Sequence, residues 1–303
     1  MIPPAWTDVW ISPWPHGHIQ AVGTDAAGRR QYRYHEAWTA QRSAAKFEDV
    51  LRFAQHLPAL REAVRRDLRR RGMPKAKALA VAVRLLDLGF FRVGNDSSAE
   101  DMGHFGLTTI RRDHVRVRGP KVEFSYVGKS GKEQCVAVLD PSVRRAVSYL
   151  LKRDDPNPEL LAWQDADGWH DIAAGHVNER LHELTGGQHS AKDFRTWSGT
   201  VMCAVALACS DARDMSETAR TRAMAWAVKE TARYLGNTPT VCRASYVHPR
   251  LFDLWRDGLT VAPVLDELAS EPDALAHQGA VEQAVLALLS EPSRGRNARK
   301  RAA

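Results

Sequence analysis

The first 38 residues alternate polar and apolar positions in a way that predicts β-strands. This stretch is rich in Trp, Pro and Gly, and it contains two arms that read HIQAVGTD and RRQYRYH. The second arm alternates with a period of two from Gln31 to Tyr34, which is the spacing of a strand. A turn at Ala26–Gly28 would join the arms, so we expect a β-hairpin here.

Helical spacing replaces this alternation from about Thr39 onward. The segment AAKFEDVLRFAQHL carries apolar residues at helical intervals, and Pro58 is expected to open a new helix. That helix, ALREAVRRDLRRRG, should stop at Gly72. A strongly apolar helix, KAKALAVAVRLLDLGFF, follows and is expected to end near Gly89.

Residues 107–139 return to a strand pattern, and the chain from Pro141 onward is mostly helical. The segments LTTI, HVRVRG, KVEFSYVG and EQCVAVLD are separated by Gly–Pro and Lys–Ser–Gly turns, which predicts a small β-rich region. The most buried helix is expected in TWSGTVMCAVALACS and the last amphipathic helix in AVEQAVLALLSEP. The predicted fold class is therefore α+β, with a small antiparallel sheet in a mainly helical domain.

The composition indicates an anionic partner. A formal net charge of +7 and a pI of about 9.4 favour nucleic acid first and an anionic membrane second. Arginine outnumbers lysine, which suits phosphate binding, although a GC-rich genome would produce the same excess. We see no stretch that would span a bilayer, no signal peptide, and no zinc or disulfide spacing among the four cysteines, so we expect reduced thiols in a cytosolic protein.

Five side chains in recognisable settings supply what attack on a phosphodiester requires. They lie in FFRVGN, YVGKSGK, AKDFRTW, YLGNTP and RASY, and they are Arg92, Lys129, Arg195, Asn237 and Tyr246. Catalysis must neutralise the non-bridging oxygens, align the nucleophile and protonate the leaving alkoxide. The arginines would bind those oxygens, the lysine would protonate the departing 5′-oxygen, and the tyrosine would form a phosphotyrosine. This chemistry needs no metal and no cofactor.

Each of the five residues also has an ordinary structural explanation. Arg92 could be a solvated cap after an apolar helix, and Lys129 could be a surface lysine of a hairpin turn. Asn237 could stop a helix before a proline, and Tyr246 could be half-buried without a role. Arg195 fits such an explanation less well, because it lies one turn into a very apolar helix. The ordered set, rather than any single member, carries the prediction.

This ordered set resembles the type IB DNA topoisomerases, specifically the small poxvirus-like branch found in bacteria. The resemblance runs through nearly the whole chain and includes FFRVGN, GHFGLTTI, FSYVGKSGKE, KDFRTW and VKETARYLGNTPTVCRASYVHP. It implies an isomerase that nicks one strand, holds the 3′-phosphate on tyrosine, lets the 5′ end rotate and religates without ATP or metal. It also implies the catalytic fold shared by tyrosine recombinases and type IB topoisomerases, closing around DNA as a C-shaped clamp.

Carried over by motif, the resemblance assigns a role to each member of the set. Tyr246 would be the nucleophile. Arg92, Arg195 and Asn237 would contact the scissile phosphate, and Lys129 would be the general acid with help from Arg92. The poxvirus pattern has histidine where Asn237 stands, but an amide N–H can still donate to a non-bridging oxygen, and bacterial members resemble this chain in using asparagine.

The resemblance also implies residues that bind DNA outside the reacting centre. Lys192 matches another lysine near the phosphate. Gln31, Tyr32 and Tyr34 match a hairpin that such enzymes place against DNA, although the two tyrosines could instead pack across strands. Family members have a β-segment before the position where Ile2 stands, so we expect either a start codon placed too late or a trimmed small lobe.

Two other functions stay open on the sequence. A tyrosine site-specific recombinase shares the catalytic fold, but it typically shows His-x-x-Arg where this chain has Lys192-Asp193-Phe194-Arg195. Recombinases also usually carry a helical N-terminal domain rather than a tryptophan-rich β-segment. A DNA-binding protein with weakened catalysis would need only the basic charge.

The predicted organisation has three parts. A partial N-terminal β-containing DNA-clamp lobe covers 1–38, a catalytic domain covers 40–290, and a basic disordered tail covers 291–303. We expect the partner to be double-stranded DNA, with no membrane and no obligate protein partner, bound by a monomer in the cytoplasm at the nucleoid. The cleavage-site preference is not predicted, because base readout depends on side-chain placement in the groove.

Overall fold

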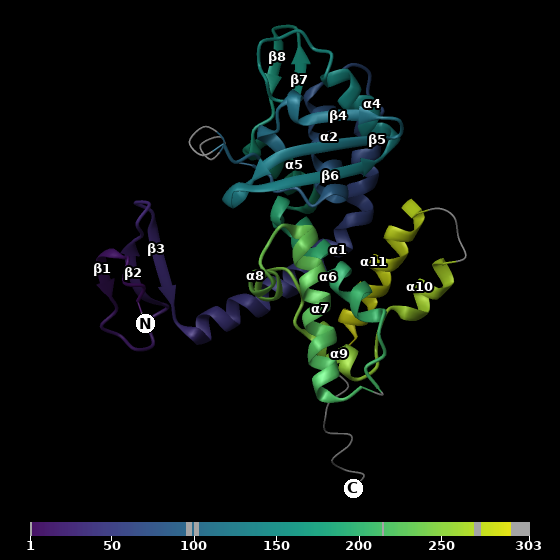
Figure 1. The fold of residues 1–303 in the computed structure, drawn as a ribbon. Helices are drawn as coiled ribbons and strands as arrows, with labels where there is room; N and C mark the ends of the chain where they lie inside the picture. The colour runs from purple at the N-terminus through teal and green to yellow at the C-terminus, as the bar shows by residue number, and fades with distance from the viewer. Residues whose placement is uncertain (1, 95–98, 100–102, 214, 270–273, 292–303) are drawn as a thin grey trace. The chain divides into compact units, whose positions relative to one another are not determined.

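The computed structural model describes residues 2–94, 99, 103–213, 215–269 and 274–291 (Figure 1). The chain divides into two compact units, Met1–Val50 and Leu51–Ala303. The predicted disordered tail lies, from residue 292 onward, outside the described residues. Within the described part of the chain, no helix is both long enough and apolar enough to cross a bilayer.

The first unit contains a three-stranded antiparallel meander. Its strands are β1 (Thr7–Ile11), β2 (Ile19–Thr24) and β3 (Arg30–Tyr34). β2 and β3 form the predicted hairpin, with Val22 opposite Tyr32. Asp25 stabilises the turn because its carboxylate accepts hydrogen bonds from the backbone N–H groups of Ala27 (2.9 Å) and Arg29 (3.0 Å). The hairpin prediction is confirmed.

Helix α1 (Glu36–Leu68) includes Pro58 in its interior. The expectation that this proline opens a new helix is therefore wrong. A proline inside a helix costs about 3 kcal/mol, because one hydrogen bond is lost and the ring crowds the preceding turn. Buried side chains at helical spacing continue on both sides of the proline, and they are Val50, Phe53, Leu57, Leu60 and Val64. Burying each contributes about 1.5–3 kcal/mol, which outweighs the cost of the proline.

Helix α2 (Lys75–Gly89) lies at the centre of the second unit. Ten of its residues are buried, and they are Ala78, Leu79, Ala80, Val81, Ala82, Val83, Leu85, Leu86, Asp87 and Gly89. The helix contacts α4 (Pro141–Leu150), α5 (Ala174–Thr185) and α6 (Ala191–Ala208). It ends where predicted, at Gly89, and the next residue, Phe90, adopts a left-handed conformation with φ 56° that redirects the chain.

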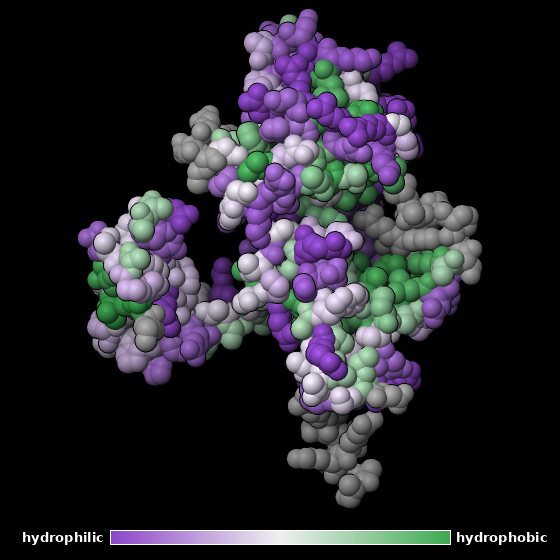
Figure 2. Space-filling view, viewed as in Figure 1, coloured by the Kyte–Doolittle hydropathy of each residue, from purple (hydrophilic) through white to green (hydrophobic). Residues whose placement is uncertain are grey.

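The predicted small sheet is present in the second unit. It consists of β4 (Val115–Arg118), β5 (Lys121–Gly128) and β6 (Lys132–Leu139) in antiparallel order. Side chains of β5 alternate between exposed and buried, and Figure 2 shows a mostly hydrophilic surface over this part of the molecule. One face of the sheet therefore packs on the helices, and the other faces solvent.

One β prediction for the second unit is corrected by the structure, and one hairpin is found in a region that is otherwise helical as predicted. The segment LTTI was expected as a strand, but Leu107–Thr109 forms a 3-10 turn, η1. It turns because the Thr109 hydroxyl accepts a hydrogen bond from the Gly106 N–H at 3.0 Å and because Gly106 packs closely on Gly94. A hairpin, β7 (Ala162–Asp165) and β8 (Gly168–Asp171), interrupts the region after Pro141 that was expected to be mostly helical.

The remaining described elements are short turns and helices. They are η2 (Arg112–His114), η3 (Lys129–Gly131), α7 (Glu217–Leu235), α8 (Pro239–Ser245), α9 (Arg250–Arg256), α10 (Ala262–Leu268) and α11 (Ala274–Ser290). The predicted buried helix is α6, and the predicted last helix is α11. The mixed α and β composition of the prediction is thus confirmed.

A buried ion network joins four helices of the second unit. Arg61 of α1 binds Asp87 of α2 and Glu282 of α11, each at 2.6 Å. Arg84 of α2 binds Asp87 at 2.6 Å and Asp140, the N-cap residue of α4, at 2.9 Å. The Asp87 side chain is only 3% exposed, so its charge depends on both arginines.

We predict that Arg61→Ala lowers the free energy of unfolding by about 3–5 kcal/mol, because it leaves two buried carboxylates short of a partner. Urea unfolding followed by circular dichroism measures this. Arg65→Ala is the matched control, since Arg65 pairs with Glu62 at the surface of the same helix, and its loss should cost less than about 1 kcal/mol. Equal losses for the two variants would contradict a structural role for the network.

Candidate active site

The loop that carries Arg92 is fixed by its own backbone. The Arg92 carbonyl accepts a hydrogen bond from the Leu107 N–H at 2.8 Å, and the Val93 carbonyl accepts one from the Thr108 N–H at 2.8 Å. Gly106 approaches Gly94 so closely that a Cβ on Gly106 would lie 2.4 Å from the Gly94 Cα. The motifs FFRVGN and GHFGLTTI therefore pair with each other. The Arg92 side chain is half-buried at the point where they meet.

Arg195 is buried one turn into α6 and is only 4% exposed. Its guanidinium donates to the carbonyl of Phe90 and, at 2.6 Å, to the carbonyl of Leu235. Burial lowers the pKa of Arg195, the charge of Arg92 lowers it further, and the Tyr246 side chain opposes both effects through charge and hydrogen bonding. The fold thus buries a guanidinium group in surroundings that disfavour its charged form.

Among the described residues, neither arginine is paired with a carboxylate. Within the described residues, no ion pair of Arg92 or of Arg195 with Asp or Glu is found, and each donates to neutral oxygens instead. Two neighbouring cations in that state repel each other and are poorly solvated. An anion that binds between them relieves both penalties, so the pair is suited to hold a phosphate.

The turn between α7 and α8 places Asn237 beside Arg92. Gly236 ends α7 with a φ of +63°, a conformation that favours glycine. Arg92 then donates to the Gly236 carbonyl at 3.2 Å and to the Asn237 Oδ1 at 2.7 Å. Thr238 accepts a hydrogen bond from the Val241 N–H and so begins α8, with a proline at its first position.

Two donors of this group have no hydrogen-bond partner among the described residues. They are the Nε of Arg195 and the Nδ2 of Asn237, and both are buried. A buried donor without a partner costs about 1–3 kcal/mol, so native proteins rarely leave one in place without a reason. Because the Asn237 Oδ1 is occupied by Arg92, its Nδ2 is left as the group that can donate to a ligand oxygen.

Tyr246 directly follows α8 and lies beside Arg195. The Arg195 Cζ is 5.4 Å from the centre of the Tyr246 ring. The backbone of Tyr246 packs on α6, where a Cβ on Gly199 would lie 2.8 Å from the Tyr246 carbonyl oxygen. The Thr200 hydroxyl donates to that carbonyl at 3.3 Å and accepts from the His248 N–H at 3.2 Å. One helix, α6, therefore positions both Arg195 and Tyr246.

Lys129 is not part of this cluster in the structure. It lies exposed in η3, at the tip of the β5–β6 hairpin, and no hydrogen bond or ion pair of Lys129 is found within the described ranges. The structure thus gathers Arg92, Arg195, Asn237 and Tyr246, and it leaves the fifth predicted residue at the end of a neighbouring hairpin.

Tyr126 is a residue of this region that the sequence reasoning missed. It is 8% exposed on β5, and burial raises its pKa to about 12, while the charges of Arg92 and Arg195 oppose that rise. Its ring stacks on Phe91 with centroids 6.2 Å apart. A signal was available, since Tyr126 precedes Lys129 by three residues in FSYVGK, within an alternating strand.

The four predicted DNA-binding residues are exposed or half-buried. Lys192 is exposed one turn before Arg195 on α6. In the first unit, Tyr32 and Tyr34 are about half exposed, and their rings stack with centroids 6.2 Å apart. Gln31 is held by Asp25, whose Oδ2 accepts from its Nε2 at 2.9 Å.

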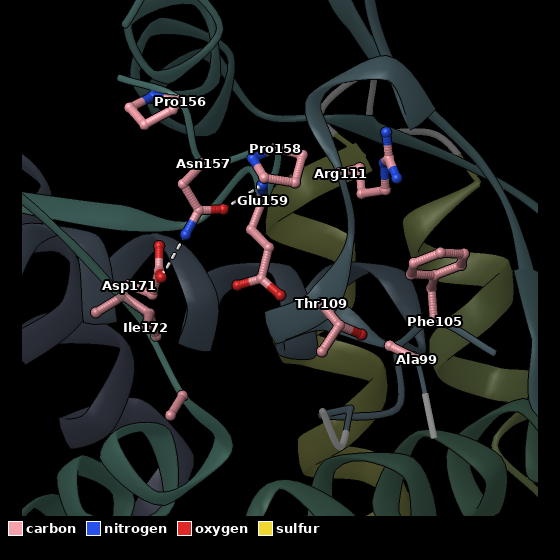
Figure 3. A pocket seen from close by; sticks show the side chains of 11 residues that line it. Ala99, Phe105, Thr109, Arg111, Pro156, Asn157, Pro158, Glu159, Asp171 and Ile172 are labelled. Carbon is pink, nitrogen blue, oxygen red and sulfur yellow. Dashed lines mark hydrogen bonds between the residues drawn. The ribbon is translucent and has the colours of Figure 1, made fainter. Parts of the chain in front are cut away.

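A pocket of about 740 Å³ lies elsewhere in the second unit (Figure 3). It is lined by polar and apolar side chains that include Arg111, Glu159 and Asp171, and none of the five predicted catalytic residues lines it. Asn157 donates a hydrogen bond to Asp171 at its edge. The pocket therefore gives no support to a small-molecule site at the arginine cluster.

Comparison with known families identifies the class. A model described as "Eukaryotic DNA topoisomerase I, catalytic core" matches residues 35–255, a range that contains all four clustered residues and Lys129. A second model, "Bacterial DNA topoisomerase IB, N-terminal domain", matches residues 1–25. The first match spans most of the chain, and the chain therefore belongs to the DNA topoisomerase I family, in its type IB branch.

Individual relatives agree with this assignment. The chain is 28% identical over 261 residues to DNA topoisomerase 1B of Acanthamoeba polyphaga mimivirus, covering 84% of this chain and 78% of the relative. It is 22% identical over 237 residues to DNA topoisomerase 1B of Vaccinia virus (strain Copenhagen), covering 78% and 72%. It is 23% identical over 204 residues to DNA topoisomerase 1 of Schizosaccharomyces pombe, covering 64% and 22%. The resemblance predicted from the motifs is confirmed.

We predict that Gly199→Ala disrupts the packing of the Tyr246 backbone on α6. The new methyl group would meet the Tyr246 carbonyl oxygen at 2.8 Å, so the tyrosine backbone must shift. A displacement of about 1 Å at a reacting group costs roughly 100-fold in rate, which an assay of supercoiled DNA relaxation would measure. Gly175→Ala is the control, because a Cβ at that position meets no atom within 4 Å. Normal relaxation by Gly199→Ala would contradict this positioning.

We also predict that His248 makes stability depend on pH. Burial, with a further contribution from the charge of Arg250, lowers the pKa of His248 from 6.5 to about 4. Between these values the unfolded chain binds a proton that the folded chain does not, so stability falls as pH falls from about 6.5 to about 4. His248→Asn should flatten that part of the curve of unfolding free energy against pH. His182→Asn, at an exposed position, should leave the curve unchanged.

Proposed function

We propose that this chain is a type IB DNA topoisomerase that relaxes supercoiled DNA through a transient single-strand break. The observation that carries the proposal is a pair of arginines, one buried and one half-buried, that lie beside Tyr246 and pair with no carboxylate in the part of the chain that the structure describes. A phosphodiester supplies the negative charge that this pair lacks, and the tyrosine supplies a nucleophile within the same site. The family match gives independent support.

In the first step, the Tyr246 oxygen attacks the phosphorus of the DNA backbone. The Tyr246 hydroxyl gives its proton to water, a bond forms between the tyrosine oxygen and phosphorus, the bond from phosphorus to the 5′-oxygen breaks, and the 3′-phosphate stays on Tyr246. Arg92, Arg195 and the Nδ2 of Asn237 donate to the non-bridging oxygens, whose charge grows in the transition state. The unpartnered buried donors of Arg195 and Asn237 support these assignments.

The leaving 5′-oxygen requires a proton, and Lys129 supplies it. A lysine at the tip of a hairpin can reach a phosphodiester that is bound beside the cluster, because the body of the same hairpin presents Tyr126 near Arg92 and Arg195. The free 5′ end then rotates about the intact strand. Its hydroxyl attacks the phosphotyrosine and returns its proton to Lys129, the bond from phosphorus to the Tyr246 oxygen breaks, and that oxygen regains a proton from water. The DNA is restored, so no external energy source is consumed.

Contacts outside the reacting centre involve the DNA backbone and bases. Lys192 precedes Arg195 on the same helix and extends the positive charge along α6. Tyr32 and Tyr34 offer exposed, stacked rings, and Gln31 lies beside them on β3. Phosphate contacts dominate affinity in such interfaces, so binding weakens steeply as salt rises.

The proposal includes the fold of the second unit, the assembly and the location of the enzyme. We assign the catalytic unit to the fold that tyrosine recombinases and type IB topoisomerases share, on the strength of the family match. All four clustered side chains come from one chain, which supports a monomer that needs no protein partner. The four free cysteines are consistent with a reducing cytoplasm, where the nucleoid offers the substrate.

The test is relaxation of a supercoiled plasmid in EDTA without nucleotide. The wild-type chain should produce relaxed topoisomers, and denaturing gels should show a covalent adduct between protein and DNA. Tyr246→Phe should lose both activities by more than about 1,000-fold while keeping salt-sensitive DNA binding, because only the nucleophile is removed.

Tyr234→Phe serves as the matched control, since Tyr234 is an exposed tyrosine near the end of α7 and has no assigned role. It should relax DNA at the wild-type rate. A wild-type chain that binds DNA but forms no denaturant-resistant adduct would refute the proposed function and favour a DNA-binding protein.

A further inference from the structure

The side chain of Gln134 lies between two glycines that directly precede two of the assigned residues. A Cβ on Gly128 would lie 2.9 Å from the Gln134 Cγ, and a Cβ on Gly236 would lie 2.9 Å from its Oε1. Gly128 is followed by Lys129, and Gly236 is followed by Asn237. One half-buried glutamine therefore contacts the backbone on both sides of the site.

The backbone around both glycines is fixed by its own contacts. Gly236 has a φ of +63° and ends α7, and its carbonyl accepts a hydrogen bond from Arg92 at 3.2 Å. Gly128 pairs with Lys132 at the last position of the β5–β6 ladder. A Cβ at either position would require the Gln134 side chain to move, so the hairpin tip and the asparagine turn share this one side chain as a close neighbour.

The cross-strand register explains why Gln134 faces the site. Gln134 on β6 lies opposite Tyr126 on β5, and opposite residues share one face of a sheet. Tyr126 is buried against Phe91, and the charges of Arg92 and Arg195 act on it. The Gln134 amide is oriented by hydrogen bonds from its Nε2 to the backbone carbonyls of Glu133 (3.0 Å) and Lys132 (3.5 Å).

We propose that Gln134 is a positioning residue that sets the reach of Lys129 toward the leaving 5′-oxygen. It acts by bracing the hairpin tip against the turn that carries Asn237, and it touches no reacting atom. The inference rests on the function proposed above, because it acts through the assigned proton donor. It predicts a defect in protonation of the leaving group, which differs from a defect in binding or in nucleophilic attack.

The experiment compares two DNA duplexes that contain the same mapped cleavage site. One has the natural 5′-oxygen at the scissile bond, and the other has sulfur in that position. A thiolate leaves without a proton, so only the oxygen duplex depends on a general acid. Single-turnover rates of covalent adduct formation are measured on denaturing gels at saturating enzyme.

We expect Gln134→Ala to slow cleavage of the oxygen duplex by about 10- to 100-fold and to leave cleavage of the sulfur duplex within about 2-fold of wild type. Lys129→Ala should show the same pattern with a larger loss. Gln134→Met keeps the length of the side chain and should stay close to wild type. Cys135→Ser, at the next residue and on the opposite face of β6, should have no effect.

Several outcomes would overturn the inference. Equal slowing of both duplexes by Gln134→Ala would mean a role in folding or binding, and no slowing would mean no role. If Gln134→Ala slowed only the oxygen duplex and Lys129→Ala did not, Gln134 would not act through Lys129. Melting curves establish that the variants are folded. Failure of the proposed function itself appears differently, as a wild-type chain that forms no adduct with either duplex.

Discussion

The site depends on two arginines that the fold holds close together and that pair with no Asp or Glu among the described residues. Arg195 is almost fully buried, Arg92 is half-buried, and their donors reach backbone carbonyls, the Asn237 amide oxygen and the Tyr246 side chain. Mutual repulsion and burial both disfavour this arrangement in the absence of an anion. In the proposed function, a scissile phosphate removes that penalty, and the stabilisation grows as negative charge accumulates on its oxygens during attack.

The geometry follows from two helix ends, those of α2 and α7, whose carbonyls meet the arginines. The left-handed residue after α2 directs the Phe90 carbonyl to Arg195, and the glycine after α7 exposes the Leu235 and Gly236 carbonyls to the guanidinium groups. Helix α6 then holds Tyr246 through Gly199 and Thr200, one turn beyond Arg195. Asn237 and Tyr246 lie at element boundaries, where a few backbone angles determine their direction.

Local patterns predicted what local forces determine, and they failed where tertiary contacts decide. The N-terminal hairpin, the end of α2 and strands β4–β6 followed from periodicity and turn residues. Pro58 remains inside α1 because distant residues bury the stripe on either side of it, and LTTI turns because Gly106 packs on Gly94. Four of the five predicted catalytic residues converge, but the positions of Tyr126 and Gln134 depend on strand register, which the motifs do not specify.

The most direct measurement identifies the amino acid that carries the DNA. Wild-type protein is trapped on a nicked duplex and digested with nuclease and trypsin, and the peptides are analysed by mass spectrometry. The account predicts a nucleotide 3′-phosphate on the peptide that runs from Ala244 to Arg250, attached to Tyr246. Attachment to any other residue, such as Tyr126, would contradict it.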